Sequence, residues 1–154
     1  MFKALIEKLY LSQPGNLVYY DSMTGCKTRL YYDRVAKDKY SLGNYGVCYV
    51  DIDNLKAIND KKGHLEGDRL IKDISNKLLH LEGVLDVCRI GGDEFVLFTN
   101  IPFDLNQVYK IKHVSSGFDF TDVCQSLETT ISNAEKAMYR EKELKRKNGK
   151  ARNN

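Results

Sequence analysis

The sequence lacks any segment that would insert into a membrane or direct the chain out of the cell. No stretch reaches the roughly 20 consecutive apolar residues of a membrane-spanning helix. Residues 1–11 alternate charged and apolar side chains, whereas a secretory signal peptide needs an uncharged apolar core. The chain also has no internal repeat and no Pro/Gly/Ser-rich linker. These absences predict one cytoplasmic domain with no membrane partner.

Metal-binding cysteine spacing is absent as well. The four cysteines show neither C-x-x-C nor C-x-x-H spacing, and three of them lie within apolar runs. Small buried thiols are common in protein cores. We therefore expect reduced core cysteines at these positions. They are Cys26, Cys48, Cys88 and Cys124.

The chain has little net charge, but its positive charge is concentrated at the C-terminal end. The net charge is +3, and the chain is strongly basic from Lys142 onward. Such a run is usually a solvated helix end, and the alternative is a contact for phosphate or nucleic acid. The run has no interleaved aromatic residues and matches no nucleic-acid recognition fold, so we do not expect nucleic acid as a partner.

The residues that are present indicate a folded core. A chain of 154 residues is long enough for one domain that buries most of its apolar surface. Its hydrophobic content of 42%, with ten Tyr and six Phe, excludes a disordered chain. Apolar residues at helical spacing predict helices over 2–11, 28–35, 55–62, 65–79 and 127–144. Aromatic and β-branched runs predict strands over 45–52, 84–90, 95–99 and 107–118.

This order of elements predicts an α+β domain, with a mainly antiparallel central sheet and helices on one side. Gly91 and Gly92 lie between two predicted strands. Such a pair favours a tight hairpin turn in which both central residues take positive φ. Asp93 and Glu94 would then lie at the mouth of this hairpin.

Acidic residues end one predicted strand and begin another. Asp51 and Asp53 close the strand over 45–52, and period-two alternation puts their side chains on the same face of the sheet. Alone, such a pair is usually a solvated rim. If the hairpin packs beside this strand, Asp93 comes near Asp51, and close carboxylates repel unless a cation neutralises them. Oxygen ligands without a His or Cys cluster favour Mg²⁺ or Mn²⁺, which suits phosphoryl or nucleotidyl transfer.

Five ordered motifs resemble those of the GGDEF family, the diguanylate cyclases. The resemblance covers residues 21 to about 148. The motifs are D-S-M-T-G at 21–25, D-I-D-N-L-K-A-I-N-D at 51–60, G-H-L-E-G-D at 63–68, R-I-G-G-D-E-F at 89–95 and A-E-K-A-M-Y at 134–139. The resemblance implies a palm-like nucleotidyl cyclase fold of ferredoxin-like type. It divides the chain into an N-terminal helical segment (1–20), a GGDEF catalytic domain (21–148) and a basic, polar tail (149–154).

The activity that the resemblance implies is the condensation of two GTP into cyclic di-GMP with release of two pyrophosphates, across a homodimer. Asp51, the backbone carbonyl of Ile52 and Asp93 would hold Mg²⁺ or Mn²⁺. Asp93 and Glu94 would be the catalytic residues. Asp93 would help to remove the proton of the 3′-hydroxyl, and Glu94 would support the metal site.

The resemblance also assigns residues to the substrate. Asn59 and Asp68 would select guanine, because a carboxylate accepts from its N1–H and exocyclic amine. The remaining positions would contact phosphate, except His64, which would orient the substrate. They are the backbone amides after Asp53 at Asn54 and Leu55, and the side chains of Lys56, Lys142 and Arg146. Ordinary alternatives are helix capping for Asn59 and Asp68 and a turn residue for His64.

The chain departs from the family pattern in several places. Residues 100–111 replace a full helix, so we expect one family helix to be missing after Thr99 and a hairpin to stand in its place. The family's R-x-x-D product-inhibition motif is absent from 81–86, and Lys145 replaces the glycine of K-x-x-G-R. The alternative to an enzyme is therefore a shortened, non-catalytic module that binds GTP or a partner.

Overall fold

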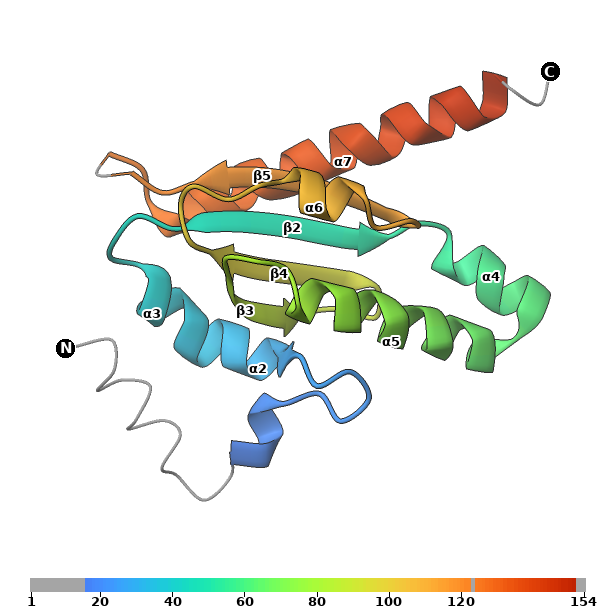
Figure 1. Cartoon of the computed structure of the whole chain (residues 1–154), viewed down its shortest axis with the longest axis horizontal. Helices are drawn as coiled ribbons and strands as arrows, with labels where there is room; N and C mark the ends of the chain where they lie inside the picture. The colour runs from blue at the N-terminus through green and yellow to red at the C-terminus, as the bar shows by residue number, and fades with distance from the viewer. Residues whose placement is uncertain (1–15, 123, 152–154) are drawn as a thin grey trace.

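The computed structural model describes residues 16–122 and 124–151. The helix predicted over 2–11 lies outside these residues. The described chain alternates helices and strands along its length (Figure 1). The strands are β1 (Lys27–Thr28), β2 (Gly46–Ile52), β3 (Val84–Arg89), β4 (Glu94–Thr99) and β5 (Val114–Phe120). The helices are η1 (Asn16–Tyr19), α2 (Arg29–Tyr31), η2 (Tyr32–Ala36), α3 (Lys37–Tyr40), α4 (Leu55–Lys62), α5 (His64–Leu79), α6 (Asn106–Tyr109) and α7 (Leu127–Ala151).

The strands form one sheet in the order β1-β3-β4-β2-β5. The two-residue β1 runs parallel to β3, and every other neighbouring pair is antiparallel. Strand β2 is paired on both sides, with Val50 opposite Phe95 of β4 and opposite Ser116 of β5. All of its residues are buried. The prediction of a mainly antiparallel α+β sheet is confirmed.

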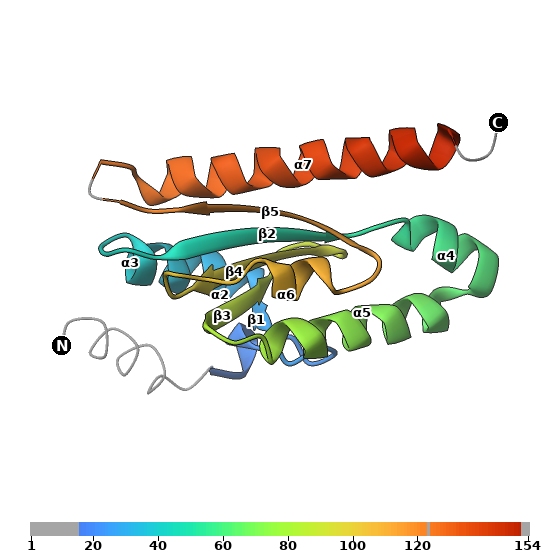
Figure 2. The same ribbon diagram turned by 45° about the horizontal axis from the view of Figure 1, so that its top comes forward.

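Helices cover both faces of this sheet, so the prediction of helices on one side is wrong. Figure 2 shows α7 on one side of the sheet and α5 on the other. Val47 and Tyr49 of β2 belong to the core cluster under α7, whereas Cys48 and Val50 belong to the cluster under α5. Because β2 is apolar on both faces, each face must be covered by helices.

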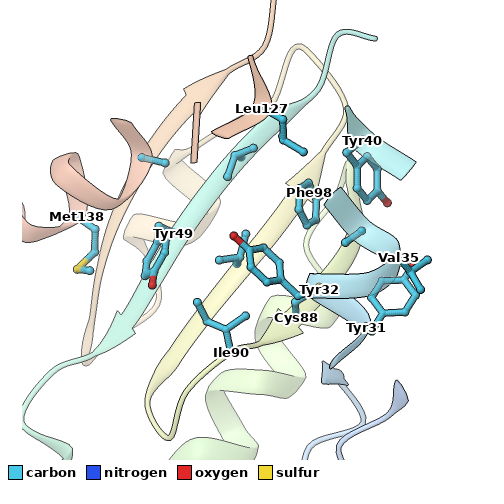
Figure 3. Close-up of a cluster of buried hydrophobic side chains, with 14 residues drawn as sticks. Tyr31, Tyr32, Val35, Tyr40, Tyr49, Cys88, Ile90, Phe98, Leu127 and Met138 are labelled. Carbon is cyan, nitrogen blue, oxygen red and sulfur yellow. The ribbon is translucent and has the colours of Figure 1, made fainter. Parts of the chain in front are cut away.

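The core on the α7 face also includes the helical stretch from α2 to α3. Figure 3 shows Tyr32 and Tyr40 from this stretch together with Phe98 of β4 and Met138 of α7. The ring centroids of Tyr40 and Phe98 lie 4.2 Å apart and the rings are nearly parallel. The α2–α3 stretch and α7, which are far apart in sequence, therefore pack into one core on this face of the sheet.

A buried polar cluster lies at the edge of that core. Asp86 of β3 accepts hydrogen bonds from the hydroxyls of Tyr31 (2.9 Å) and Tyr40 (2.6 Å). Its Oδ2 also lies 3.0 Å from Nζ of Lys39. Asp86 and Lys39 are both buried, and a buried charge requires partners of this kind. The cluster fixes α2 and α3 against β3.

Helix α7 lies close to β5 because residue 117 has no side chain. A Cβ at Gly117 would lie 2.1 Å from the carbonyl oxygen of Ala134 and 2.3 Å from the backbone nitrogen of Met138. No side chain fits at such distances. Gly117 therefore sets the distance between α7 and the sheet, and with it the position of the basic residues farther along α7.

The connection between β4 and β5 differs in detail from the prediction. The strand expected over 107–118 begins only at Val114, and residues 106–109 form the one-turn helix α6. Residues 100–113 are all described and contain no strand, so the expected hairpin is wrong. The missing full helix is confirmed. Val108 of α6 and Ile111 in the turn after it are buried in the core on the α5 side of the sheet. Their burial explains the apolar pattern of this segment, which a strand would also give.

The Gly91–Gly92 turn also differs from the prediction. Neither glycine has positive φ. The loop spans residues 90–93, and the N–H groups of Ile90 and Gly91 both donate to the carbonyl of Glu94. A four-residue loop does not need the geometry of a two-residue turn. A Cβ at Gly91 would lie 2.6 Å from Oε2 of Glu94, the end of a flexible side chain that can move aside.

The cysteine prediction holds at three positions. Cys26, Cys48 and Cys88 are buried and free, whereas Cys124 is exposed. Within residues 16–122 and 124–151, no helix combines the length and apolarity needed to cross a bilayer.

Candidate functional site

The predicted acidic residues meet where β2 ends beside the β3–β4 loop. Asp51 pairs in register with Glu94 of β4, and the N–H of Ile52 donates to the carbonyl of Asp93 at 2.9 Å. Asp51 and Asp53 both contact α7 residues, so they share one face of the sheet as predicted. The antiparallel pairing of β2 with β4 thus brings the expected acidic residues together.

Burial and mutual repulsion act on these carboxylates. Burial is the main cause that raises the pKa of Asp51, and the charges of Asp93 and Asp53 add to it, while the ammonium of Lys142 opposes the rise. The pKa of Glu94 is raised by burial first and then by the charges of Asp93 and Asp51. Such crowding of partly buried carboxylates favours a bound cation.

Two lysines of α7 supply positive charge at this point. Nζ of Lys142 lies 2.5 Å from Oδ1 of Asp51. Nζ of Lys145 lies 3.5 Å from Oδ2 of Asp53 and 3.0 Å from Oε1 of Glu141, and it donates a hydrogen bond to the carbonyl of Val114. The basic run is therefore helical here, and part of it contacts the acidic end of β2.

A hollow of about 560 Å³ opens beside these contacts. Its lining combines acidic, basic and backbone groups from β2, α4, the β3–β4 loop and α7. The residues are Ile52, Asp53, Asn54, Leu55, Lys56, Asp93, Lys142, Lys145, Arg146 and Gly149. Seven of the predicted site residues are among them: Ile52, Asn54, Leu55, Lys56, Asp93, Lys142 and Arg146.

Helix α4 begins at the wall of this hollow. Its N-cap Asn54 adopts the left-handed conformation (φ 59°, ψ 25°), which asparagine tolerates better than most residues. The first amides of a helix have no partner within the helix and attract anions. The residue before this N-cap is also held in place, because the N–H of Asp53 donates to the carbonyl of His113 at 2.8 Å. His113 adopts positive φ as well. Leu55 and Lys56, the first two residues of α4, both line the hollow, so the start of this helix lies at its wall.

The expected guanine-selecting residues lie on the neighbouring pair of helices. Asn59 is in the middle of α4 and Asp68 is inside α5, so capping is the wrong interpretation for both. Among the described residues, buried Oδ1 of Asn59 has no hydrogen-bond partner. It lies against Gly67, where a Cβ would come within 1.9 Å of it. His64 is the exposed first residue of α5. The other five predicted site residues do not line the hollow: Asp51, Asn59, His64, Asp68 and Glu94.

Some residues at the site were not predicted. In the sequence Lys145 stands out only because it replaces the glycine of K-x-x-G-R, and its contact with Asp53 depends on the packing of α7. Arg89 donates to the carbonyl of Gly92 at 2.7 Å and lies 3.4 Å from Asp21. It thus holds the loop that carries Asp93. Its place in the R-I-G-G-D-E-F motif was the signal that could have identified it.

The predicted ligands have the chemistry that a hard divalent cation requires, and binding of such an ion by them stays a prediction. Asp51 already contacts one cation, the ammonium of Lys142, which shows that its carboxylate is accessible to positive charge from the α7 side. In the described parts of the chain, no three His, Cys, Asp or Glu side chains form a metal-binding group. The predicted set needs only two carboxylates, of Asp51 and Asp93, with the carbonyl of Ile52. Oxygen ligands of this kind suit Mg²⁺ or Mn²⁺.

Comparison with known proteins agrees with this architecture. The family described as "Diguanylate cyclase, GGDEF domain" matches residues 18–102. The chain belongs to the GGDEF family. The match includes the acidic end of β2, the helices α4 and α5, and the β3–β4 loop.

Curated relatives of this GGDEF chain carry names from cyclic di-GMP metabolism. The probable diguanylate cyclase DgcI of Escherichia coli K12 is 30% identical over 161 residues, which cover 95% of this chain and 35% of that protein. The diguanylate cyclase DgcS of Shewanella oneidensis is 29% identical over 103 residues, with 63% and 35% covered. The cyclic di-GMP phosphodiesterase PdeR of Escherichia coli K12 is 46% identical over 56 residues, with 36% and 8% covered. The GGDEF chain spans about a third or less of the length of these relatives.

Solved structures share the GGDEF fold. A microbial GGDEF domain described in its interaction with cyclic di-GMP superposes with a TM-score of 0.69 at 26% identity, covering 80% of this chain and 90% of that one. The GGDEF domain of FimX from Pseudomonas aeruginosa gives 0.69 at 13% identity, with 82% and 94% covered. The second likeness shows the fold alone.

Proposed function

We propose that the chain is a diguanylate cyclase that condenses two GTP into cyclic di-GMP and two pyrophosphates, with two copies each presenting one GTP. The observation that supports this most is the position of the hollow. Its lining brings the acids Asp53 and Asp93 together with cations of α4 and α7. A metal-bound triphosphate needs these two kinds of group side by side.

In this proposal Asp51, the carbonyl of Ile52 and Asp93 hold Mg²⁺ or Mn²⁺. When bound, the ion offsets negative charge that develops on the α-phosphate and the leaving pyrophosphate. Asp93 lies in the loop fixed by Arg89, and its carboxylate accepts the proton of the attacking 3′-hydroxyl. The 3′-oxygen forms the new bond to phosphorus as the bond to pyrophosphate breaks. Glu94 borders the ligands and keeps negative charge beside them.

The phosphates would be bound by backbone and side-chain donors from opposite walls of the hollow. The start of α4, with Leu55 and Lys56, lines it on one side and would supply backbone amides there. Lys142 and Arg146 face it from α7, where a spacing of four residues puts them on one helix face. Charge-assisted hydrogen bonds from both walls would orient the α-phosphate for in-line attack.

The base would be read by Asn59 and Asp68. The buried Oδ1 of Asn59 without a partner supports this assignment, because buried polar atoms are almost always paired. A carboxylate at Asp68 accepts from the N1–H and amine of guanine, whereas adenine presents an acceptor at N1. Adenine would therefore leave Asp68 facing a lone pair, which is strongly selective in a site that excludes water. His64 would orient the substrate from the start of α5.

The test is turnover by the purified chain. Incubation with GTP and Mg²⁺, with products separated by chromatography, should yield cyclic di-GMP and pyrophosphate. Asp93→Ala should lower the rate by at least about 100-fold, as expected when a group that acts on the reacting atoms is removed. Lys136→Ala, on an exposed part of α7, is the matched control and should keep full activity. Product from Asp93→Ala at the wild-type rate would refute the proposal.

A second candidate is a non-catalytic module that binds GTP or a partner. It is favoured by the short β4–β5 connection, which carries only the single turn of α6. One relative, PdeR, is named a phosphodiesterase rather than a cyclase. GTP binding by calorimetry without product, in the presence of Mg²⁺ or Mn²⁺, would decide for this module. A cytoplasmic location stays a prediction under either function.

A further inference from the structure

We propose that Lys142 is a built-in counter-ion that occupies the cation position at Asp51 until a metal ion and a triphosphate arrive together, and that Lys145 holds α7 in this arrangement. The inference rests on the proposed function, since it concerns the same metal and nucleotide. It adds a mechanism that makes binding of the two ligands interdependent.

The contact between Lys142 and Asp51 differs from the surface ion pairs of this protein. Its side chains are 27% and 6% exposed, and it joins residues 91 apart in sequence at 2.5 Å. The pair Lys77–Asp73, in contrast, links neighbours on one helix, and both side chains are at least half exposed. A largely buried pair is screened little by water or salt. Lys142 therefore competes effectively with any other cation for Oδ1 of Asp51.

Lys145 fixes the same part of α7 through separate contacts. Its ammonium contacts Asp53 and Glu141 and donates to the carbonyl of Val114 on β5. Asp53 is held in turn by the hydroxyl of Ser115 at 2.6 Å. A glycine at position 145, as in the motif K-x-x-G-R, would have none of these contacts. This substitution gives α7 a second attachment to the acidic end of β2.

Competition between Lys142 and a metal ion at Asp51 couples metal binding to nucleotide binding. A metal ion that binds alone must displace Lys142 and leave its ammonium without that carboxylate. A triphosphate supplies new anionic oxygens for the displaced ammonium within the same hollow, whose lining includes Lys142. Each ligand then lowers the cost of binding the other, and this coupling is reciprocal. Wild-type protein should bind the metal weakly alone and much more tightly with GTP.

The experiment measures two bindings in Lys142→Met. Free Mn²⁺ is titrated into the protein without nucleotide by electron paramagnetic resonance, and GTP is titrated in excess chelator by calorimetry. We expect Mn²⁺ alone to bind about tenfold more tightly than in wild type, and GTP alone about tenfold more weakly, within the usual range of coupling between sites. Lys142→Arg should keep the wild-type behaviour. Lys145→Gly should shift Mn²⁺ binding in the same direction by about threefold, a smaller coupling.

Arg146→Met is the matched control for a general loss of positive charge. Arg146 lines the same hollow and makes no ion pair with an acid in the described part of the chain. Its loss should weaken GTP binding without tightening Mn²⁺ binding.

Equal tightening in Arg146→Met and Lys142→Met, or unchanged Mn²⁺ affinity in Lys142→Met, would overturn the inference while leaving the proposed function intact. Wild-type protein that binds neither Mn²⁺ nor Mn²⁺ with GTP would instead refute the proposed function. Circular dichroism checks that each variant is folded, and Lys142→Gln replaces Lys142→Met if that variant is not.

Discussion

At the scale of single residues, Asp86 shows how a buried charge stabilises this fold. Its carboxylate is contacted by two tyrosine hydroxyls and by Lys39, and the Asp86 and Lys39 side chains are 7% and 6% exposed. Asp86→Asn should lower the free energy of unfolding by about 3 kcal/mol, because the negative charge that these donors face is removed. Urea denaturation measures the loss. Asp73→Asn, which removes an exposed pair with Lys77, is the control and should cost less than about 1 kcal/mol.

The carboxyl of Asp21 should make the folding stability of this protein depend on pH. Burial raises the pKa of this carboxyl, but hydrogen bonds from Thr24 and the charge of Arg89 outweigh it, so the pKa lies below its ordinary value of 3.8. A carboxyl whose pKa is lowered by folding stabilises the protein above its unfolded pKa, and this contribution disappears as pH falls through the folded pKa. The stability difference between wild type and Asp21→Asn should therefore be largest near neutral pH and shrink below about pH 4. Denaturant midpoints from pH 3 to 7 measure it, and a difference that grows in acid would contradict the assignment.

At the scale of elements, the close approach of α7 to β5 depends on Gly117. Gly117→Ala should lower the free energy of unfolding by about 3 kcal/mol, because its Cβ would collide with the backbone of α7 rather than with a movable side chain. Gly149→Ala is the matched control, since a Cβ there meets nothing within 4 Å. In a helix that change should be neutral or stabilising. Equal stability of the two variants in urea would contradict this account of α7 packing.

The elements also show what the sequence could and could not predict. Strand β2 and helix α5 follow from long apolar patterns, and the approach of Asp93 to Asp51 follows from pairing β2 with the strand after the loop. β1 and α6 are too short to show a period. The contact of Lys142 with Asp51 depends on how far α7 lies from the sheet. That distance is set by Gly117, for which the local pattern gives no signal.

At the scale of the whole molecule, the hollow at the end of β2 would bind one triphosphate in the proposed reaction, whereas the proposed product joins two nucleotides. Cyclisation should therefore need two copies facing each other. We expect the initial rate per unit of protein to rise with protein concentration and to level off where sedimentation velocity shows the dimer to be complete. Asp93→Ala should show the same distribution of masses without product. A rate per unit of protein that stays constant as the dimer dissociates would contradict a two-copy mechanism.

The central position of β2 has a consequence for the stability of the site. A strand that is paired along both edges and covered on both faces opens only when the whole domain unfolds. In deuterated water, the amide protons of residues 47–51 should therefore exchange last, whereas those in the final turns of α7 should exchange early. Asp51, one of the two carboxylates that would bind the ion, therefore belongs to the part of the molecule that should open least, whereas Asp93 lies in the loop before β4 and the cations opposite them lie on α7.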